Sequence, residues 1–394
     1  RGLGDVYKRQ LRAVPVKEDT MAANLPEKLE WRGKGGAEEH FFCMTAEPGA
    51  NFEAELRSLM GRYRELGGGG EDEFLLRFHV SDPMRQSETL RRMAGERNSY
   101  VSVVGQPPAN GARVALEAWH IGGMLEKRRK EDQGGTVVTA RRPHYRLFLA
   151  GRKESSAPDS YGQMREEFRW LDRAAAAHGG TVPELVHRTW IYCRDIDNNY
   201  RGLVEGRNER FDRYGLTPET HFIASTGIEG CTETPGRLLH MDSLGIVGLK
   251  PGQVRYMEAP DYLSPTHLYR VAFERGARIV YGDRSHYFLS GTASIDAEGN
   301  IVHPGDVARQ TARTLENMNA LMERNGGSLS DLKQAVVYLR DWADRPNASR
   351  RMMESPLAAV PHLLLKAPVC RPGWLVEIDG IAVNGAGDGA FAPL

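Results

Sequence analysis

The sequence is poor in several features that define common protein classes. Its 394 residues include four cysteines (Cys43, Cys193, Cys231 and Cys370), and no two of them form a C-x-x-C pair. This spacing argues against a disulfide framework and against a zinc ribbon. No apolar run reaches the roughly 18 residues of a membrane-spanning helix, and no secretory signal is recognisable. We therefore expect a soluble protein of the cytoplasm that does not bind membranes.

The sequence also lacks a surplus of either charge. Lys and Arg together number 52, and Asp and Glu together also number 52. A protein that neutralises several phosphates usually carries a basic surplus, so nucleic-acid binding is not expected. We find no phosphate loop, no metal-ligand spacing and no G-x-S-x-G motif. The sequence therefore predicts neither a metal ion nor another cofactor.

What is present is an ordinary globular composition. Apolar residues make up 40% and charged residues 26%, with 43 glycines and 21 prolines, which excludes collagen and coiled coil. The length predicts two or three domains. Residues 5–10 (DVYKRQ) resemble the translated end of a sequencing adapter, and Met21 is a candidate start. We therefore set residues 1–37 apart as an adapter artefact and N-terminal tail.

One pattern occurs three times along the chain. Helical periodicity predicts helices over 52–66, 160–178 and 307–324. After each comes an apolar, β-branched or aromatic strand that closes on an aspartate placed to cap a helix. These strands are 75–82, 189–195 and 336–341, ending at Asp82, Asp195 and Asp341. A second strand then carries an acid near its centre, over 113–121, 238–246 and 375–381.

We interpret this pattern as three related α+β units. They are predicted at 38–123, 144–250 and 284–385, with polar linkers between them. The alternative is that similar runs recur by coincidence in any α+β chain.

Motifs in the third unit resemble the YjgF/Rid superfamily. They are FLSGTAS at 288–294, G-D-x3-Q at 305–310, Glu316-Asn317 and EIDGIA at 377–382. The resemblance covers the third unit well, the second moderately and the first weakly. Rid proteins are typically trimers of a small α+β subunit, with sites in the clefts between subunits. The resemblance thus implies tandem Rid-like (chorismate-mutase-like) units that form a single-chain pseudo-trimer with three non-equivalent clefts, strands inside and helices outside.

Within that superfamily the chain is most similar to the chorismatase branch. The matching segments are SGTASI at 290–295, YR…GR at 200–207 and, with the leucine shifted by one residue, a CR..L..E run at 370–377. Two segments differ: DAEGN at 296–300 replaces a His-containing stretch, and EID at 377–379 replaces Glu-Ile-Glu. The resemblance implies a metal-free hydrolase or lyase. Its substrate would be chorismate or a similar small enol-ether carboxylate, attacked by acid-catalysed water addition with release of pyruvate.

Glu377 is the leading candidate for a catalytic group. Period-2 alternation places it on the same strand face as Asp379. In a cleft, desolvation would raise its pKa toward the range useful for acid–base work, whereas on a solvated face it would be a surface charge. In ordinary Rid enzymes the matching glutamate handles a water molecule, as the resemblance implies.

Cys370 is the second catalytic candidate. We expect a strand, a Pro-Gly turn and a strand around it, and the turn length decides its orientation. A four-residue loop pairs Cys370 with Leu375 and puts it about 7 Å from Glu377 on one face. A three-residue loop puts it on the opposite face. Cys370 could equally be a small buried hydrophobe.

Tyr200, Arg201, Arg207 and Arg350 are the candidates for substrate binding. Guanidinium forks bind carboxylates bidentately, so these arginines predict a small carboxylate-bearing substrate as the partner. A spacing of six does not put Arg201 and Arg207 on one helical stripe, so one is expected to face the cleft and the other solvent. Arg350 could be a surface charge. The oligomeric state stays open, a monomer included.

Two other functions compete with this one. The first is an imine or enamine deaminase of the Rid type, although the arginine that those enzymes carry fifteen residues before the glutamate is His362 here. The second is a non-catalytic small-molecule sensor. At the position of Glu377 the first unit has Ala115 and the second has His240. Only the cleft beside Glu377, with residues donated by the second unit, is therefore predicted to function.

Overall fold

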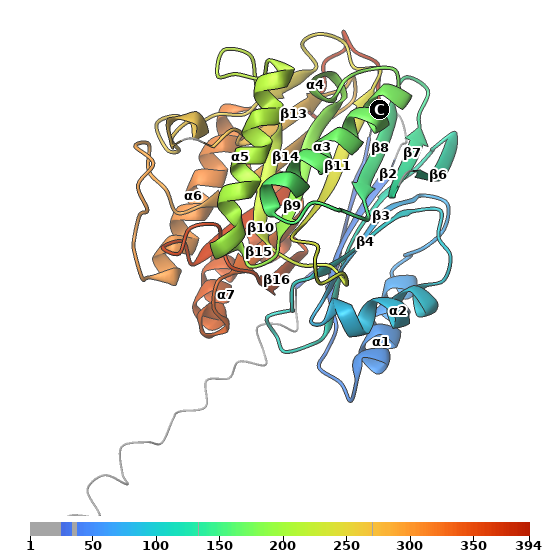
Figure 1. Ribbon diagram of the computed structural model, residues 1–394, viewed down its shortest axis with the longest axis vertical. Coiled ribbons are helices and arrows are strands. Elements are labelled where there is room, and N and C mark those ends of the chain that lie inside the picture. Colours follow the sequence, from blue (N-terminus) through green and yellow to red (C-terminus); the bar gives the residue numbers. More distant parts are fainter. Residues whose placement is uncertain (1–24, 34–37, 133, 270) are drawn as a thin grey trace, which may run out of the picture.

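The computed structural model describes residues 25–33, 38–132, 134–269 and 271–394 (Figure 1). Its described residues form a mixed α+β fold with three sheets, each built from one continuous stretch of chain. The predicted α+β class with tandem units is confirmed. The adapter-like residues 5–10 and Met21 lie outside the described residues.

The three sheets share one strand order. In each sheet, the last strand of the unit lies between the first long strand and a central strand. The central strand then pairs in parallel with an edge strand. In the first sheet these are β2 (Glu38–Thr45), β5 (Val114–Ile121), β3 (Glu73–Val80) and β4 (Tyr100–Gly105). In the second they are β8 (Arg146–Arg152), β11 (Leu239–Val247), β9 (Val186–Cys193) and β10 (Ala224–Glu229). In the third they are β14 (Ser285–Ala293), β17 (Val376–Asn384), β15 (Leu332–Leu339) and β16 (His362–Lys366).

Further strands extend each sheet beyond the predicted bounds of its unit. β1 (Lys28–Arg32) pairs with β2, inside the segment expected to be a tail. The segments expected to be linkers also form strands, which pair in sequence with the first strand of the next unit. These are β6 (Glu126–Asp132), β7 (Gly135–Arg141), β12 (Val254–Tyr256) and β13 (Gly276–Val280). The charge of β6 and the short length of β12 hid these two strands from sequence reasoning.

The three predicted helices are confirmed as α1 (Phe52–Glu65), α3 (Ser160–Ala177) and α6 (Val307–Arg324). Each begins at a polar N-cap whose side chain accepts a backbone N–H: Asn51, Asp159 and Asp306. The remaining helices are α2 (Pro83–Ala94), α4 (Val182–Leu185), α5 (Ile196–Tyr214) and α7 (Arg345–Met353). None of the helices in the described ranges is long and apolar enough to span a membrane.

The three strand-ending aspartates cap to different degrees. Asp82 accepts from the backbone of Arg85 at the start of α2, as predicted. Asp195 occupies the N-cap of α5, but its side chain makes no cap hydrogen bond. Instead, Glu229 of the neighbouring strand accepts from the backbone N–H groups of residues 195 and 196. Asp341 caps a short 3₁₀ turn rather than a long helix.

The units meet in a ring. The edge strand of each contacts an early strand of another: β4 lies against β7, β10 against β13 and β14, and β16 against β2. The helices lie outside the sheets (Figure 1). The largest apolar core contains Leu75, Tyr192 and Tyr338, one from the central strand of each sheet. Strands thus face the centre and helices face outward.

Buried polar groups join the units around this centre. Arg77 of β3 donates to Asp242 of β11 (3.0 Å), and Arg188 of β9 donates to Asp379 of β17 (2.8 Å). Gln334 of β15 donates to Glu117 of β5 (3.3 Å). Each contact links the central strand of one unit to the last strand of another. We call these six residues the central polar ring.

Candidate active site

A cleft opens between the second and third units, where β10 runs beside β14. Its walls come from α5, β10, β14, β17 and the segments before β13 and β17. The lining residues are Tyr200, Arg207, Ser225, Gly227, Val271, Phe273, Arg275, Gly291, Ala293, Ile295, Cys370, Arg371, Trp374 and Glu377. It therefore combines a carboxyl group, a thiol, a phenol and three guanidinium groups.

The SGTASI segment joins the two units at this boundary. The backbone N–H of Ser225 donates to the Ser290 hydroxyl (2.9 Å), which donates in turn to the carbonyl of Glu274 (2.6 Å). The backbone N–H of Gly291 donates to the Thr226 hydroxyl (3.0 Å). Hydrogen bonds to side-chain hydroxyls thus replace a regular backbone ladder between β10 and β14. This leaves a gap between these two strands.

Glu377 is only 5% exposed and points into this gap. It lies opposite Ala293, next to an irregularity in the β14–β17 pairing between Leu289 and Thr292. A Cβ atom on Gly291 would come within 2.0 Å of the Glu377 Oε1 atom. Glycine at 291 therefore makes room for the carboxyl group.

The surroundings of Glu377 keep it protonated at neutral pH. Burial, followed by the negative charge of Asp379, raises its pKa to about 8, although Arg275 and Arg188 oppose the shift. Asp379 is engaged elsewhere, since its Oδ2 atom accepts from Arg188 (2.8 Å) and from Thr226 (2.7 Å). Glu377 is therefore a neutral acid that can donate a proton.

Cys370 lies in the same cleft as Glu377, but the predicted hairpin is wrong. β16 pairs in parallel with β15, and β17 pairs with the other edge of β15, so the strands flanking Cys370 are not neighbours. The segment instead crosses over the end of β15, where Val369 bridges to Ile228 of β10. Neither of the two predicted loop lengths applies, because a crossover connection sets the position of Cys370.

The Cys370 thiol is not a nucleophile in its resting state. Burial and then the charge of Glu377 raise its pKa to about 12, so it is a neutral S–H group. The hydroxyl of Tyr200 on α5 lies near this thiol and lines the same cleft. Tyr200 thus brings the second unit close to the crossover segment.

Tyr200 and Arg207 share one face of α5, because seven residues make about two helical turns. Arg207 is buried, and its guanidinium lies 5.8 Å from the ring centre of Phe273. Arg201 points the other way: its side chain is 88% exposed and pairs with Glu205 (2.7 Å). The assignment of Arg201 to the site is wrong, because one residue along a helix rotates a side chain by about 100°.

The assignment of Arg350 is also wrong. It is exposed on α7 and does not line the cleft. Sequence reasoning missed Arg275 instead, which lines the cleft, is 6% exposed and stacks at 5.4 Å on Phe273. Arg275 was overlooked because it falls in a segment expected to be a linker.

Arg371 and Trp374 form one wall of the cleft, and Gln310 of α6 holds this wall in place. The Arg371 guanidinium stacks on the Trp374 ring (5.0 Å), and the Trp374 indole donates to the carbonyl of Ser294 (3.1 Å). Gln310 donates to the carbonyl of Gly373 (2.9 Å) and accepts from the backbone of residue 375 (2.8 Å). The G-D-x3-Q motif thus supplies a helix cap and a clamp on this wall.

The open space in the cleft is about 40 Å³, which suits a water molecule but not a ring compound. A substrate of that size therefore requires a wall to move outward.

The other two units carry different residues at the position of Glu377. On the central strands, Tyr338 lies opposite Glu377, Tyr192 opposite His240 and His79 opposite Ala115. The pairing therefore supports the equivalence read from the sequence. His240 lines a separate cleft between the first and second units. Among the described residues, no group of three or more His, Cys, Asp or Glu side chains is placed to hold a metal ion.

Comparisons with known proteins agree with this geometry. The model of the Endoribonuclease L-PSP family matches residues 279–384, which span β14 to β17. A 3-aminoacrylate deaminase, RutC of Acinetobacter baylyi, is 32% identical over 96 residues, which are 24% of this chain and 76% of that protein. The chain belongs to the YjgF/Rid superfamily. The resemblance predicted from the motifs is thus confirmed.

The similarity to one solved structure extends over nearly the whole chain. A crystal structure of a chorismatase covers 87% of this chain and 98% of its own, with a TM-score of 0.65 and 21% identity. At that identity the match shows the fold alone. The protein is therefore a Rid-superfamily member with a chorismatase-like fold.

Proposed function

We propose that the cleft beside Glu377 adds water to chorismate or a similar small enol-ether carboxylate and releases pyruvate. The observation that carries the proposal is a buried carboxylic acid with a pKa of about 8, in one cleft with the guanidinium groups of Arg207 and Arg275. A neutral acid can protonate an electron-rich double bond, and the arginines can hold carboxylates.

The proposed reaction needs only one proton donor. Glu377 gives its proton to the methylene carbon of the enol ether, and an oxocarbenium-like centre forms at the carbon that bears the ether oxygen. Water attacks that carbon, and the Glu377 carboxylate takes up the proton that the water loses. The resulting hemiketal breaks its bond to the ring oxygen, which gives pyruvate and a ring alcohol.

The decisive experiment is an assay of pyruvate release from chorismate by the purified chain. Pyruvate formation supports the proposal. Release of ammonia in an imine-generating coupled assay would favour a Rid-type deaminase, the activity in the name of the RutC relative. His362, at the position of the deaminase arginine, bonds to the backbone carbonyl of Val360 (2.8 Å) and does not line the cleft. Formation of neither product would favour a small-molecule sensor.

Turnover is expected to fall as the pH rises above about 8. The active form of Glu377 is the protonated one, and its raised pKa of about 8 keeps that form dominant at lower pH. Above that pKa the rate should drop roughly tenfold per pH unit. A pH–rate profile tests this, and a rate that instead rises with pH through 4 to 6 would mean that the ionised form acts.

Replacing Cys370 by alanine is expected to change the distribution of products or the substrate preference more than the stability. The neutral thiol lies in the cleft beside Tyr200, so it shapes the space in which water approaches. Chromatography of the products and a thermal melt would separate the two effects. Unchanged products with a large drop in melting temperature would assign Cys370 a packing role only.

A further inference from the structure

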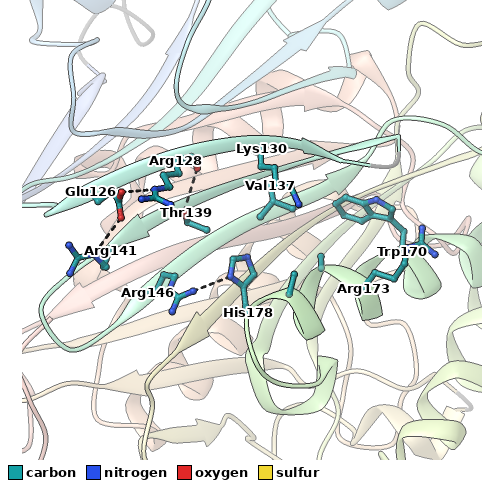
Figure 2. A pocket seen from close by; sticks show the side chains of 12 residues that line it. Glu126, Arg128, Lys130, Val137, Thr139, Arg141, Arg146, Trp170, Arg173 and His178 are labelled. Atoms are coloured by element: carbon teal, nitrogen blue, oxygen red, sulfur yellow. Dashed lines mark hydrogen bonds and ion pairs between the residues drawn. The ribbon is translucent and has the colours of Figure 1, made fainter.

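A second concave site lies at the edge of the second sheet that is formed by β6 and β7, opposite the edge formed by β10. Helix α3 packs on β8 and β11, and the β6–β7 hairpin extends the sheet beyond it. A groove of about 550 Å³ remains between the hairpin and the C-terminal half of α3. Figure 2 shows the strand side chains on one side and those of the helix on the other.

The groove gathers positive charge in a chain whose net charge is zero. Its lining includes five cationic side chains (Arg128, Lys130, Arg141, Arg146 and Arg173) and one carboxylate, Glu126. Glu126 is shared, since it pairs with both Arg128 and Arg141. In the part of the chain that the structure describes, Arg146 and Arg173 form no ion pair with a carboxylate.

Two of the cations face each other. Arg141 of β7 lies directly opposite Arg146 of β8 in the sheet register, an arrangement that destabilises a sheet unless a negative group bridges the pair. Arg146 also donates to the Nδ1 atom of His178 (3.5 Å), so that ring presents an acceptor rather than a charge. Within the lining of the groove, the cationic side chains thus outnumber the single carboxylate, Glu126.

The charges adjoin an apolar wall. Trp170, Val137, Ala174 and Ala177 line the end of the groove nearest α3. The Trp170 ring packs against the backbone of Gly135, where a Cβ atom would come within 2.2 Å of it. A ligand with an anionic end and a flat apolar end would match both parts of the lining.

We propose that this groove binds a small phosphate ester, with the phosphate between Arg141, Arg146 and Arg173 and the organic part toward Trp170. A phosphate presents several oxygens to guanidinium forks, and the groove has the size of small-molecule sites. Protection of an exposed edge strand would explain the charges on β6. It does not explain Arg146, which lies on an interior strand, or Arg173, which lies on a helix.

The test is calorimetric titration of the full chain with ADP at low salt, with inorganic phosphate and adenosine as the two partial ligands. We expect saturable binding of ADP at one site, and weaker or no binding of the partial ligands. Arg146→Gln and Arg173→Gln should each weaken ADP binding about tenfold or more. Arg169→Gln is the matched control, because Arg169 is exposed on the same helix one turn away and does not line the groove.

Three outcomes would overturn the proposal: no saturable ADP binding, equal binding by wild type and the Arg146→Gln/Arg173→Gln variant, or binding of heparin or single-stranded RNA without binding of ADP. Arg173 is exposed, so its substitution should leave the fold intact and keep the test valid if Arg146→Gln misfolds. The groove is separate from the cleft of Glu377, and pyruvate release should be unchanged in the Arg173→Gln variant.

Discussion

Replacing Glu377 by glutamine is expected to lower turnover by about 10²- to 10⁴-fold, the usual effect of removing a general acid. The amide has the shape of the neutral carboxylic acid but cannot release a proton to the substrate. Glu377 is neutral at pH 7 in the folded protein because burial raises its pKa to about 8. The substitution should therefore leave the fold intact and should not lower its stability at pH 7.

The measurement is the rate of pyruvate release, with a thermal melt of the same samples. Glu316→Gln is the matched control, since Glu316 is an exposed residue of α6 that pairs with Arg313 (3.6 Å). It should retain wild-type turnover. Near-normal turnover in Glu377→Gln would remove the catalytic assignment and move the sensor hypothesis ahead.

Glu377→Gln should also change how stability depends on pH. A carboxyl group with a raised pKa in the fold stabilises it fully below the pKa of the unfolded chain, near 4.5, and loses that contribution as the pH rises toward 8. The glutamine variant lacks this titration. Its melting temperature should therefore fall less than that of the wild type between pH 5 and pH 9.

Replacing Arg77 by methionine is expected to destabilise the protein by about 3–5 kcal/mol. Arg77 is 1% exposed and binds two carboxylates, Asp242 (3.0 Å) and Glu117 (3.2 Å), from different units. Its guanidinium also stacks on Trp190 (4.6 Å). Without it, two buried carboxylates lose a cation that lowers their pKa values, together with His240 at Asp242 and His79 at Glu117.

Urea unfolding at pH 7 measures this loss. Arg201→Met is the control, because Arg201 is 88% exposed and the same change there should leave the stability nearly unchanged. Combining Arg77→Met with Glu117→Gln and Asp242→Asn should recover part of the stability, since no unpaired charge is then left buried. A loss of under 1 kcal/mol in Arg77→Met would show that the central polar ring does not hold the units together.

Local structure followed from the sequence where periodicity and caps agree. The helix at 307–324 was predicted to the residue, because apolar positions at helical spacing lie between the Asp306 cap and the turn at Asn325-Gly326. The Asp-ended strands and the acid-bearing strands were also located to within a few residues. Periodicity and capping residues are local signals, so they can be recognised without knowledge of the fold.

The strands in the presumed linkers escaped prediction for a physical reason. β6 has the sequence EKRRKED, which no hydrophobic pattern marks as a strand. It forms because β7 pairs with it at the edge of the sheet. Tertiary context thus overrides low strand propensity.

The sequence by itself determined the superfamily, the repeat and the identity of the buried acid, because each is recorded in a short segment of residues. Only the tertiary structure decided which side chains reach Glu377. It turned Arg201 to solvent and Arg207 inward, brought in Arg275, and carried Cys370 to the cleft by a crossover in place of a hairpin. These outcomes depend on helix rotation and on contacts between units more than a hundred residues apart, which no local pattern specifies.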